Sequence, residues 1–267
     1  HHEELFIDNC VGRWSVDAIR GHDFSKPLFL WSGFAGPHDP YDTTESSLAR
    51  YEGVDIPDPV SIADELDSKP PPQRRAMKGM EGKHGLASIW WSRATPERIR
   101  RMRRHYYANI TAIDDWVGAI VAEIEARGEL ENTVFVFTSD HGDCLGDHHQ
   151  VYKFSSHYDS VARVPLVFAG PGVERIGVRD PLLQPSKQGG GEALHETVFS
   201  EYGPRIMART EGWKLVFYPG QVYGELYDLQ RDPNELYNLY VDSGCAGARG
   251  DMVERMMHWW GSTPRQN

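Results

Sequence analysis

The segment over residues 138–147 constrains the fold most, because it places two metal-competent side chains directly after a predicted β-strand. The strand is predicted over residues 133–137, a run of β-branched and aromatic residues. Asp140 and His141 follow it, and Gly142 lets the backbone turn sharply. A carboxylate beside an imidazole at the carboxyl end of a buried strand is a frequent arrangement for metal ligands in open α/β sheets. We therefore expect an enzyme.

The composition is that of an ordinary globular protein and argues against two classes of partner. The 267 residues, 40% of them hydrophobic, suffice for one core with or without a small satellite domain. A formal net charge of −11 opposes binding to nucleic acid or to an anionic membrane surface. No apolar run approaches the roughly 18–20 residues of a membrane-spanning helix. We expect a soluble protein, cytoplasmic or periplasmic, with a homo-oligomer left open.

The hydrophobic pattern predicts a layered α/β fold. Apolar runs predict two further buried strands, over residues 27–34 and 164–170. A long amphipathic helix is predicted to begin after Thr95-Pro96 and to end at Gly128. Residues 51–95 are rich in proline and poor in periodicity, so they are interpreted as an excursion over the surface. These spacings predict a mostly parallel central sheet covered by helices.

The pattern changes in the last quarter of the chain. Three short strands separated by turn residues are predicted over residues 206–210, 213–217 and 225–229. We therefore expect a small antiparallel C-terminal subdomain over residues 201–267, after an α/β domain over residues 1–200. The three cysteines, which are odd in number and widely spaced, are expected to be free thiols: Cys10, Cys144 and Cys245.

Five blocks of sequence follow one another in an order that is typical of one family. They are Pro27–Pro40, Arg104–Asp114, Phe137–Asp143, Arg163–Leu166 and Glu225–Leu229, the last followed by Asp232, Pro233 and Glu235. Together they resemble the sulfatase family of the alkaline-phosphatase superfamily, and most closely its branch of arylsulfatases and phosphonate monoester hydrolases. The resemblance implies an alkaline-phosphatase-like sandwich and hydrolysis of a small-molecule sulfate or phosphonate ester.

The resemblance also implies roles for four residues. Asp140 and His141 would bind one divalent cation, Ca²⁺ or Mn²⁺, which would polarise the ester. Lys153 would contact the ester oxyanion as a point charge. His38 would donate to the oxyanion or to the leaving oxygen, a role for which an imidazole titrates in a suitable range. Asp143, Asp147, His148 and His149 enrich the same loop, and we expect them to tie it down or to face water.

Two features of the family pattern are absent from the sequence. The family nucleophile is a formylglycine made from a cysteine in a Cys-x-Pro/Ala-x-Arg motif near the N-terminus, and none of the three cysteines fits that motif. The segment between Gly172 and Glu201 is also shorter than is usual in the family. Because the chain starts at His1 and not at methionine, we expect the nucleophile and further metal ligands to lie upstream, in a missing N-terminal part of the domain.

Three functions remain open from the sequence. The favoured one is hydrolysis of sulfate esters by the parent enzyme, with the chain as given inactive alone because the nucleophile is absent. A phosphonate or phosphate ester hydrolase of the same superfamily is the alternative within enzymes. A non-catalytic, metal-stabilised binding module is the alternative of another class.

Overall fold

The computed structural model describes residues 3–74, 94–153, 156–173 and 196–263, which form two compact units. The first unit contains residues 1–58, 82–136 and 167–173, and the second contains residues 59–81, 137–166 and 174–267. Across the described ranges, no helix has the length and apolar character needed to cross a membrane.

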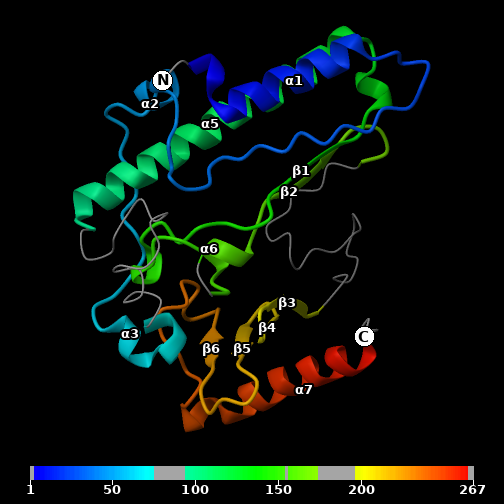
Figure 1. Ribbon diagram of the computed structural model, residues 1–267. Helices are drawn as coiled ribbons and strands as arrows, with labels where there is room; N and C mark the ends of the chain where they lie inside the picture. Colours follow the sequence, from blue (N-terminus) through cyan, green and yellow to red (C-terminus); the bar gives the residue numbers. More distant parts are fainter. Residues whose placement is uncertain (1–2, 75–93, 154–155, 174–195, 264–267) are drawn as a thin grey trace. The chain divides into compact units, whose positions relative to one another are not determined.

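Two long helices form the body of the first unit (Figure 1). Helix α1 (Ile7–Gly21) packs along α5 (Pro96–Ala126), and the unit also contains the short elements η1 (Glu3–Leu5), α2 (Glu45–Ala49) and η3 (Leu130–Asn132). The two helices approach closely at Gly12, where an added Cβ would lie 2.0 Å from the ring of Trp116. Nearby, the Trp116 indole N–H donates to Asn9 Oδ1 at 2.7 Å. Glycine at position 12 is therefore required by the packing.

Helix α5 confirms the predicted helix at both ends. The Thr95 hydroxyl accepts a hydrogen bond from the Arg98 backbone N–H at 3.3 Å, and Pro96 is the first helical residue. The helix ends at Ala126, and Gly128 then adopts a left-handed conformation with a φ of 74°. These signals are local to the sequence, which is why they predicted the boundaries well.

The strands β1 (Phe135–Thr138) and β2 (Leu166–Ala169) pair in a two-stranded sheet. Both were predicted at nearly these positions, but the prediction that they are buried is wrong, since seven of their eight residues are exposed. The predicted strand over residues 27–34 is also wrong: that segment has no strand, and Phe29 and Trp31 are 90% and 77% exposed. Apolar sequence predicted strands, but burial also needs covering layers, and the described residues do not provide them.

The second unit is built on a four-stranded antiparallel sheet (Figure 1). Its strands run in the order β3 (Val198–Tyr202), β4 (Arg205–Arg209), β5 (Trp213–Phe217) and β6 (Glu225–Asp228). In the register of the central strands, Leu215 lies opposite Ala208 on one side and Leu226 on the other. The predicted meander is therefore confirmed, with β3 as an additional strand that the sequence did not reveal.

Helix α7 (Ala246–Ser262) packs on this sheet, where Met252 and Met256 join the buried residues Ala208, Leu215 and Leu226. Shorter elements also belong to the second unit: α3 (Glu65–Ser68), η4 (Asp147–His149), α6 (Asp159–Ala162) and η5 (Ser243–Cys245). The expectation that residues 51–95 only cross the surface is wrong for the part around α3. Glu65, Lys69 and Gln73 are all buried there, and polar groups of His148, Tyr227 and Tyr158 respectively offset part of their loss of water.

Candidate functional site

The loop that follows β1 carries three of the four predicted site residues, with Asp140 and His141 at its start and Lys153 at its end. Close to its start, the Gly142 N–H donates to the carbonyl oxygen of Val161 at 2.8 Å. The Leu145 N–H donates to the Val151 carbonyl at 2.9 Å, which brings the two halves of the loop together. The loop is therefore an ordered structure with its own hydrogen bonds.

Cys144 anchors the same loop in the interior of the second unit. It is fully buried in a cluster with Tyr158, Val161, Tyr227 and Leu229. Burial raises the pKa of its thiol to about 12, and hydrogen bonds with Ser156 and Ser160 only partly oppose this. A thiol with such a pKa is a poor nucleophile at neutral pH, so Cys144 has a packing role. All three cysteines are free, as predicted.

Asp140 and His141 lie together with their metal-binding atoms facing one another. The Asp140 Oδ1 accepts the backbone N–H of His141 at 2.9 Å, and its Oδ2 lies 3.6 Å from His141 Nε2. His141 Nδ1 lies 2.9 Å from the carbonyl oxygen of Gly142, which selects the tautomer with the proton on Nδ1. Nε2 then carries the lone pair, at 3.6 Å from Asp140 Oδ2.

This pair is suited to supply two ligands of a metal site. An imidazole held by a backbone carbonyl and a carboxylate oxygen close beside it are suitable ligands for a divalent cation. The Asp140 side chain is 85% exposed and that of His141 is 32% exposed, so a cation can reach both. Among the residues that the structure describes, no group of three or more His, Cys, Asp or Glu side chains converges as a metal site. The pair alone supplies two ligands, and a complete shell needs others.

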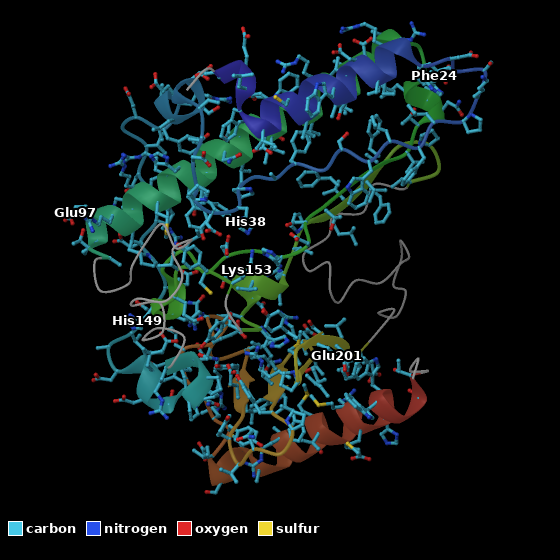
Figure 2. The ribbon with its side chains drawn as sticks, viewed as in Figure 1. Phe24, His38, Glu97, His149, Lys153 and Glu201 are labelled. Carbon is cyan, nitrogen blue, oxygen red and sulfur yellow. The ribbon has the colours of Figure 1, made fainter. Side chains whose placement is uncertain are left out.

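The other two predicted site residues belong to different units, Lys153 to the second and His38 to the first, and both are labelled in Figure 2. Lys153 is half-buried, and its carbonyl oxygen accepts the Ser156 hydroxyl at 3.4 Å. His38 is exposed in the first unit, where its Nδ1 lies 2.8 Å from the carbonyl oxygen of Asp39. The same Nδ1 lies 3.2 Å from Asp39 Oδ1, so both contacts orient the ring. The structure thus brings Asp140 and His141 together and places Lys153 on their loop.

Asp8 holds the backbone just before His38, a role that the sequence did not reveal. Its Oδ1 accepts the backbone N–H groups of Ala35 at 2.8 Å and of Gly36 at 3.0 Å. Asp8 is fully buried, and burial raises the pKa of its carboxyl although these N–H groups oppose the shift. In the described part of the chain, Asp8 Oδ2 and the Oδ1 of buried Asn109 both lack a hydrogen-bond partner.

We expect Asp8→Asn to increase the free energy of unfolding by about 1–2 kcal/mol at pH 7.5. The amide keeps an oxygen for Ala35 and Gly36, removes a buried charge and supplies a donor toward Asn109. Because the folded-state pKa is raised above the unfolded value of 3.8, the contribution of Asp8 to stability is present below that value. The wild-type protein loses this contribution as the pH rises through the folded-state pKa. The gain in unfolding free energy of Asp8→Asn over the wild type should therefore shrink toward pH 4.

Urea unfolding of both proteins at pH 4 and at pH 7.5 measures this difference. Asp17→Asn is the matched control, because Asp17 lies on the same helix and its exposed side chain pairs with exposed Arg20 in α1. Lower stability of Asp8→Asn at pH 7.5 would show that the carboxylate is needed in its charged form.

Comparison with known proteins identifies the fold. The crystal structure of the phosphonate monoester hydrolase of Agrobacterium radiobacter superposes on 98% of this chain and 62% of its own, with a TM-score of 0.76 and 22% identity. Its likeness shows the expected alkaline-phosphatase-like α/β fold, with the antiparallel sheet at the C-terminal end.

Sequence comparison then identifies the family. The sequence profile of the sulfatase family matches residues 13–188. An arylsulfatase of Clostridium perfringens is 27% identical over 90% of this chain and 54% of its own length. A choline-sulfatase of Rhizobium meliloti is 30% identical over 88% of this chain and 51% of its own. This chain belongs to the sulfatase family, and it spans about half the length of these curated relatives.

Proposed function

We propose that the protein containing these residues hydrolyses small-molecule sulfate esters, and that this chain supplies cation and oxyanion contacts of its site. The observation that carries the proposal is the Asp140–His141 pair, whose carboxylate oxygen and imidazole nitrogen lie 3.6 Å apart at a strand end. Family membership supports the reaction class, since the curated relatives are an arylsulfatase and a choline-sulfatase.

The proposed chemistry assigns a separate task to each residue. A divalent cation held by Asp140 and His141, Ca²⁺ or Mn²⁺, would polarise the ester when bound. The Lys153 ammonium would neutralise charge on the non-bridging oxygens, and the His38 imidazole would hydrogen-bond to the oxyanion or leaving oxygen. The attacking group expected from the family is a formylglycine. The sequence holds no cysteine in the motif that yields it.

Hydrolysis of phosphonate esters is a second candidate for the same site. The likeness to a phosphonate monoester hydrolase at a TM-score of 0.76 favours it, and both ester classes present a tetrahedral group with charged oxygens. Lys153 and His38 would serve either substrate in the same way. A comparison of the rates at which the protein hydrolyses a sulfate ester and a phosphonate ester therefore decides between the two functions.

Titration with Mn²⁺, followed by electron paramagnetic resonance, tests the cation site in the purified chain. We expect one site, with affinity at least about tenfold weaker in Asp140→Asn and in His141→Ala, because each removes a ligand. Asp143→Asn is the matched control in the same loop and should leave the affinity unchanged. Equal affinity in all four proteins would contradict the assignment of Asp140 and His141.

A second arm of this experiment separates Lys153 from the cation. Lys153→Ala should weaken the binding of inorganic sulfate to the Mn²⁺-loaded chain by roughly tenfold, without changing the affinity for Mn²⁺ itself. The chain alone should not turn over 4-nitrophenyl sulfate, because the nucleophile is absent from its sequence. Binding of Mn²⁺ without any effect of Lys153 on sulfate would favour a metal-stabilised binding module.

A further inference from the structure

The loop between Asp140 and Lys153 has a backbone conformation that its residues do not favour by themselves. Leu145, His148 and His149 have φ angles of 50°, 54° and 56°, in the left-handed region. Such angles are uncommon for residues other than glycine, and they persist where surrounding structure holds them. Hydrogen bonds within the loop contribute to holding this conformation, and contacts from outside the loop add to them.

Those contacts come from a segment more than 80 residues earlier in the chain. The Val60 N–H donates to Asp147 Oδ1 at 2.8 Å, and the Val60 carbonyl accepts the His148 N–H at 2.8 Å. The carbonyl oxygen of Ile62 lies 2.8 Å from His149 Nε2. We call Val60, Ile62 and the following Glu65 the loop clamp. Asp147, His148 and His149 thus tie the loop down, as the sequence predicted.

Glu65 makes the strongest contact of the loop clamp. Its Oε1 lies 2.7 Å from His148 Nδ1 and 3.2 Å from Lys69 Nζ, and all three side chains are buried. Burial alone would raise the pKa of the Glu65 carboxyl, but the hydrogen bond from His148 and the charge of Lys69 outweigh it and lower the pKa. The His148 ring also stacks on the Tyr158 ring, with centroids 3.6 Å apart.

We propose that Glu65 and His148 are positioning residues for the candidate site. They fix the middle of the loop, so that the Asp140–His141 pair at its start and Lys153 at its end keep a constant spacing. The role of that spacing rests on the proposed function, whereas the clamping of the loop can be measured without it. Neither Glu65 nor His148 is a ligand in this proposal.

Hydrogen exchange of the loop amides and Mn²⁺ affinity together test the proposal in the intact chain. Glu65→Gln keeps the shape of the side chain but removes its charge. We expect exchange of the Leu145, Gly146 and His148 amides to accelerate by about tenfold. Mn²⁺ affinity should fall by about tenfold, because the ligands lose their fixed orientation. The matched control is Glu225→Gln, which alters an equally buried carboxylate that accepts two tyrosine hydroxyls instead.

The His148→Gly variant distinguishes the loss of the contact with Glu65 from the relief of backbone strain. Glycine tolerates the left-handed conformation, so strain relief alone predicts unchanged or slower exchange in the loop. The proposal predicts faster exchange, as in Glu65→Gln, because the contact with Glu65 is lost. Exchange within about twofold of the wild type in both variants, or an equal acceleration in Glu225→Gln, would overturn it. Absence of Mn²⁺ binding in the wild type would refute the cation site, while the exchange rates would still decide whether the clamp exists.

Discussion

Replacing Lys214 by methionine is expected to lower the free energy of unfolding by about 3–5 kcal/mol, because it removes the buried cation that faces the buried Glu235 and the half-buried Asp159 carboxylates. The Lys214 side chain is fully buried, and its Nζ lies 2.5 Å from Asp159 Oδ1 and 2.5 Å from Glu235 Oε1. It also donates to the carbonyl oxygen of His157 at 2.8 Å. The contact with Glu235 acts through charge and through a hydrogen bond, both of which act to lower the pKa of the Glu235 carboxyl.

The two carboxyl groups respond differently to this arrangement. Burial would raise the pKa of Asp159, but Lys214 and Arg209 outweigh it and lower that pKa. Burial raises the pKa of Glu235, and the charge of Lys214 only partly opposes the shift. Loss of the ammonium therefore leaves Asp159 with Arg209 as its remaining cation, at 3.1 Å, among the described residues.

Urea denaturation monitored by tryptophan fluorescence measures the effect of Lys214→Met. Arg255→Met is the matched control in the same unit, because it breaks an exposed ion pair with Glu196. Such pairs contribute about 0–1 kcal/mol. If Lys214→Met lowers the free energy of unfolding no more than the control does, the carboxylates of Asp159 and Glu235 do not depend on Lys214 for stability.

Gly142→Ala is expected to lower the free energy of unfolding by about 1–3 kcal/mol and to weaken Mn²⁺ binding. An added Cβ would lie 2.1 Å from the carbonyl oxygen of Ser160, a backbone atom that cannot move away by rotating a side chain. A hydrogen bond of 2.8 Å from the Gly142 N–H to the Val161 carbonyl oxygen holds the two backbone segments this close together. Relief of the clash must therefore shift the backbone next to His141, one of the proposed ligands.

Gly247→Ala provides the contrast for this prediction. Gly247 lies in α7, and nothing lies within 4 Å of an added Cβ. Alanine there should add about 0.5–1 kcal/mol to the free energy of unfolding, because it restricts the unfolded chain. Thermal unfolding of both variants measures their stability, and a Mn²⁺ titration of each measures its affinity for the cation. A Gly142→Ala protein as stable as Gly247→Ala would contradict the close approach at Ser160.

The sequence predicted the elements whose causes are local. Helix α5 begins at the Thr95 cap and ends before Gly128 because these residues satisfy or terminate helical hydrogen bonds wherever they occur. Strands β4, β5 and β6 were found because turn residues separate short apolar runs. Strand β3 was missed, because its sequence has little apolar alternation before the turn that pairs it with β4.

Properties that depend on distant residues could not be predicted in the same way. The apolar pattern of β1 and β2 identified strands but not their exposure, which depends on what packs over them. The Asp140–His141 pair was identified because its residues are adjacent in sequence. The contact of His148 with Glu65 joins residues 83 positions apart, and no local pattern marks it. Asp8 was missed for the same reason. The proposed division at residue 200 remains a prediction.

Anomalous diffraction at the manganese edge, from crystals of the chain grown with Mn²⁺, tests the central claim most directly. We expect a peak about 2–2.5 Å from both an Asp140 carboxylate oxygen and His141 Nε2. The same crystals should show the Nδ1 of His141 still directed at the carbonyl oxygen of Gly142. A peak at other residues, or none at saturating Mn²⁺, would contradict the claim that this pair holds the cation of a sulfatase site.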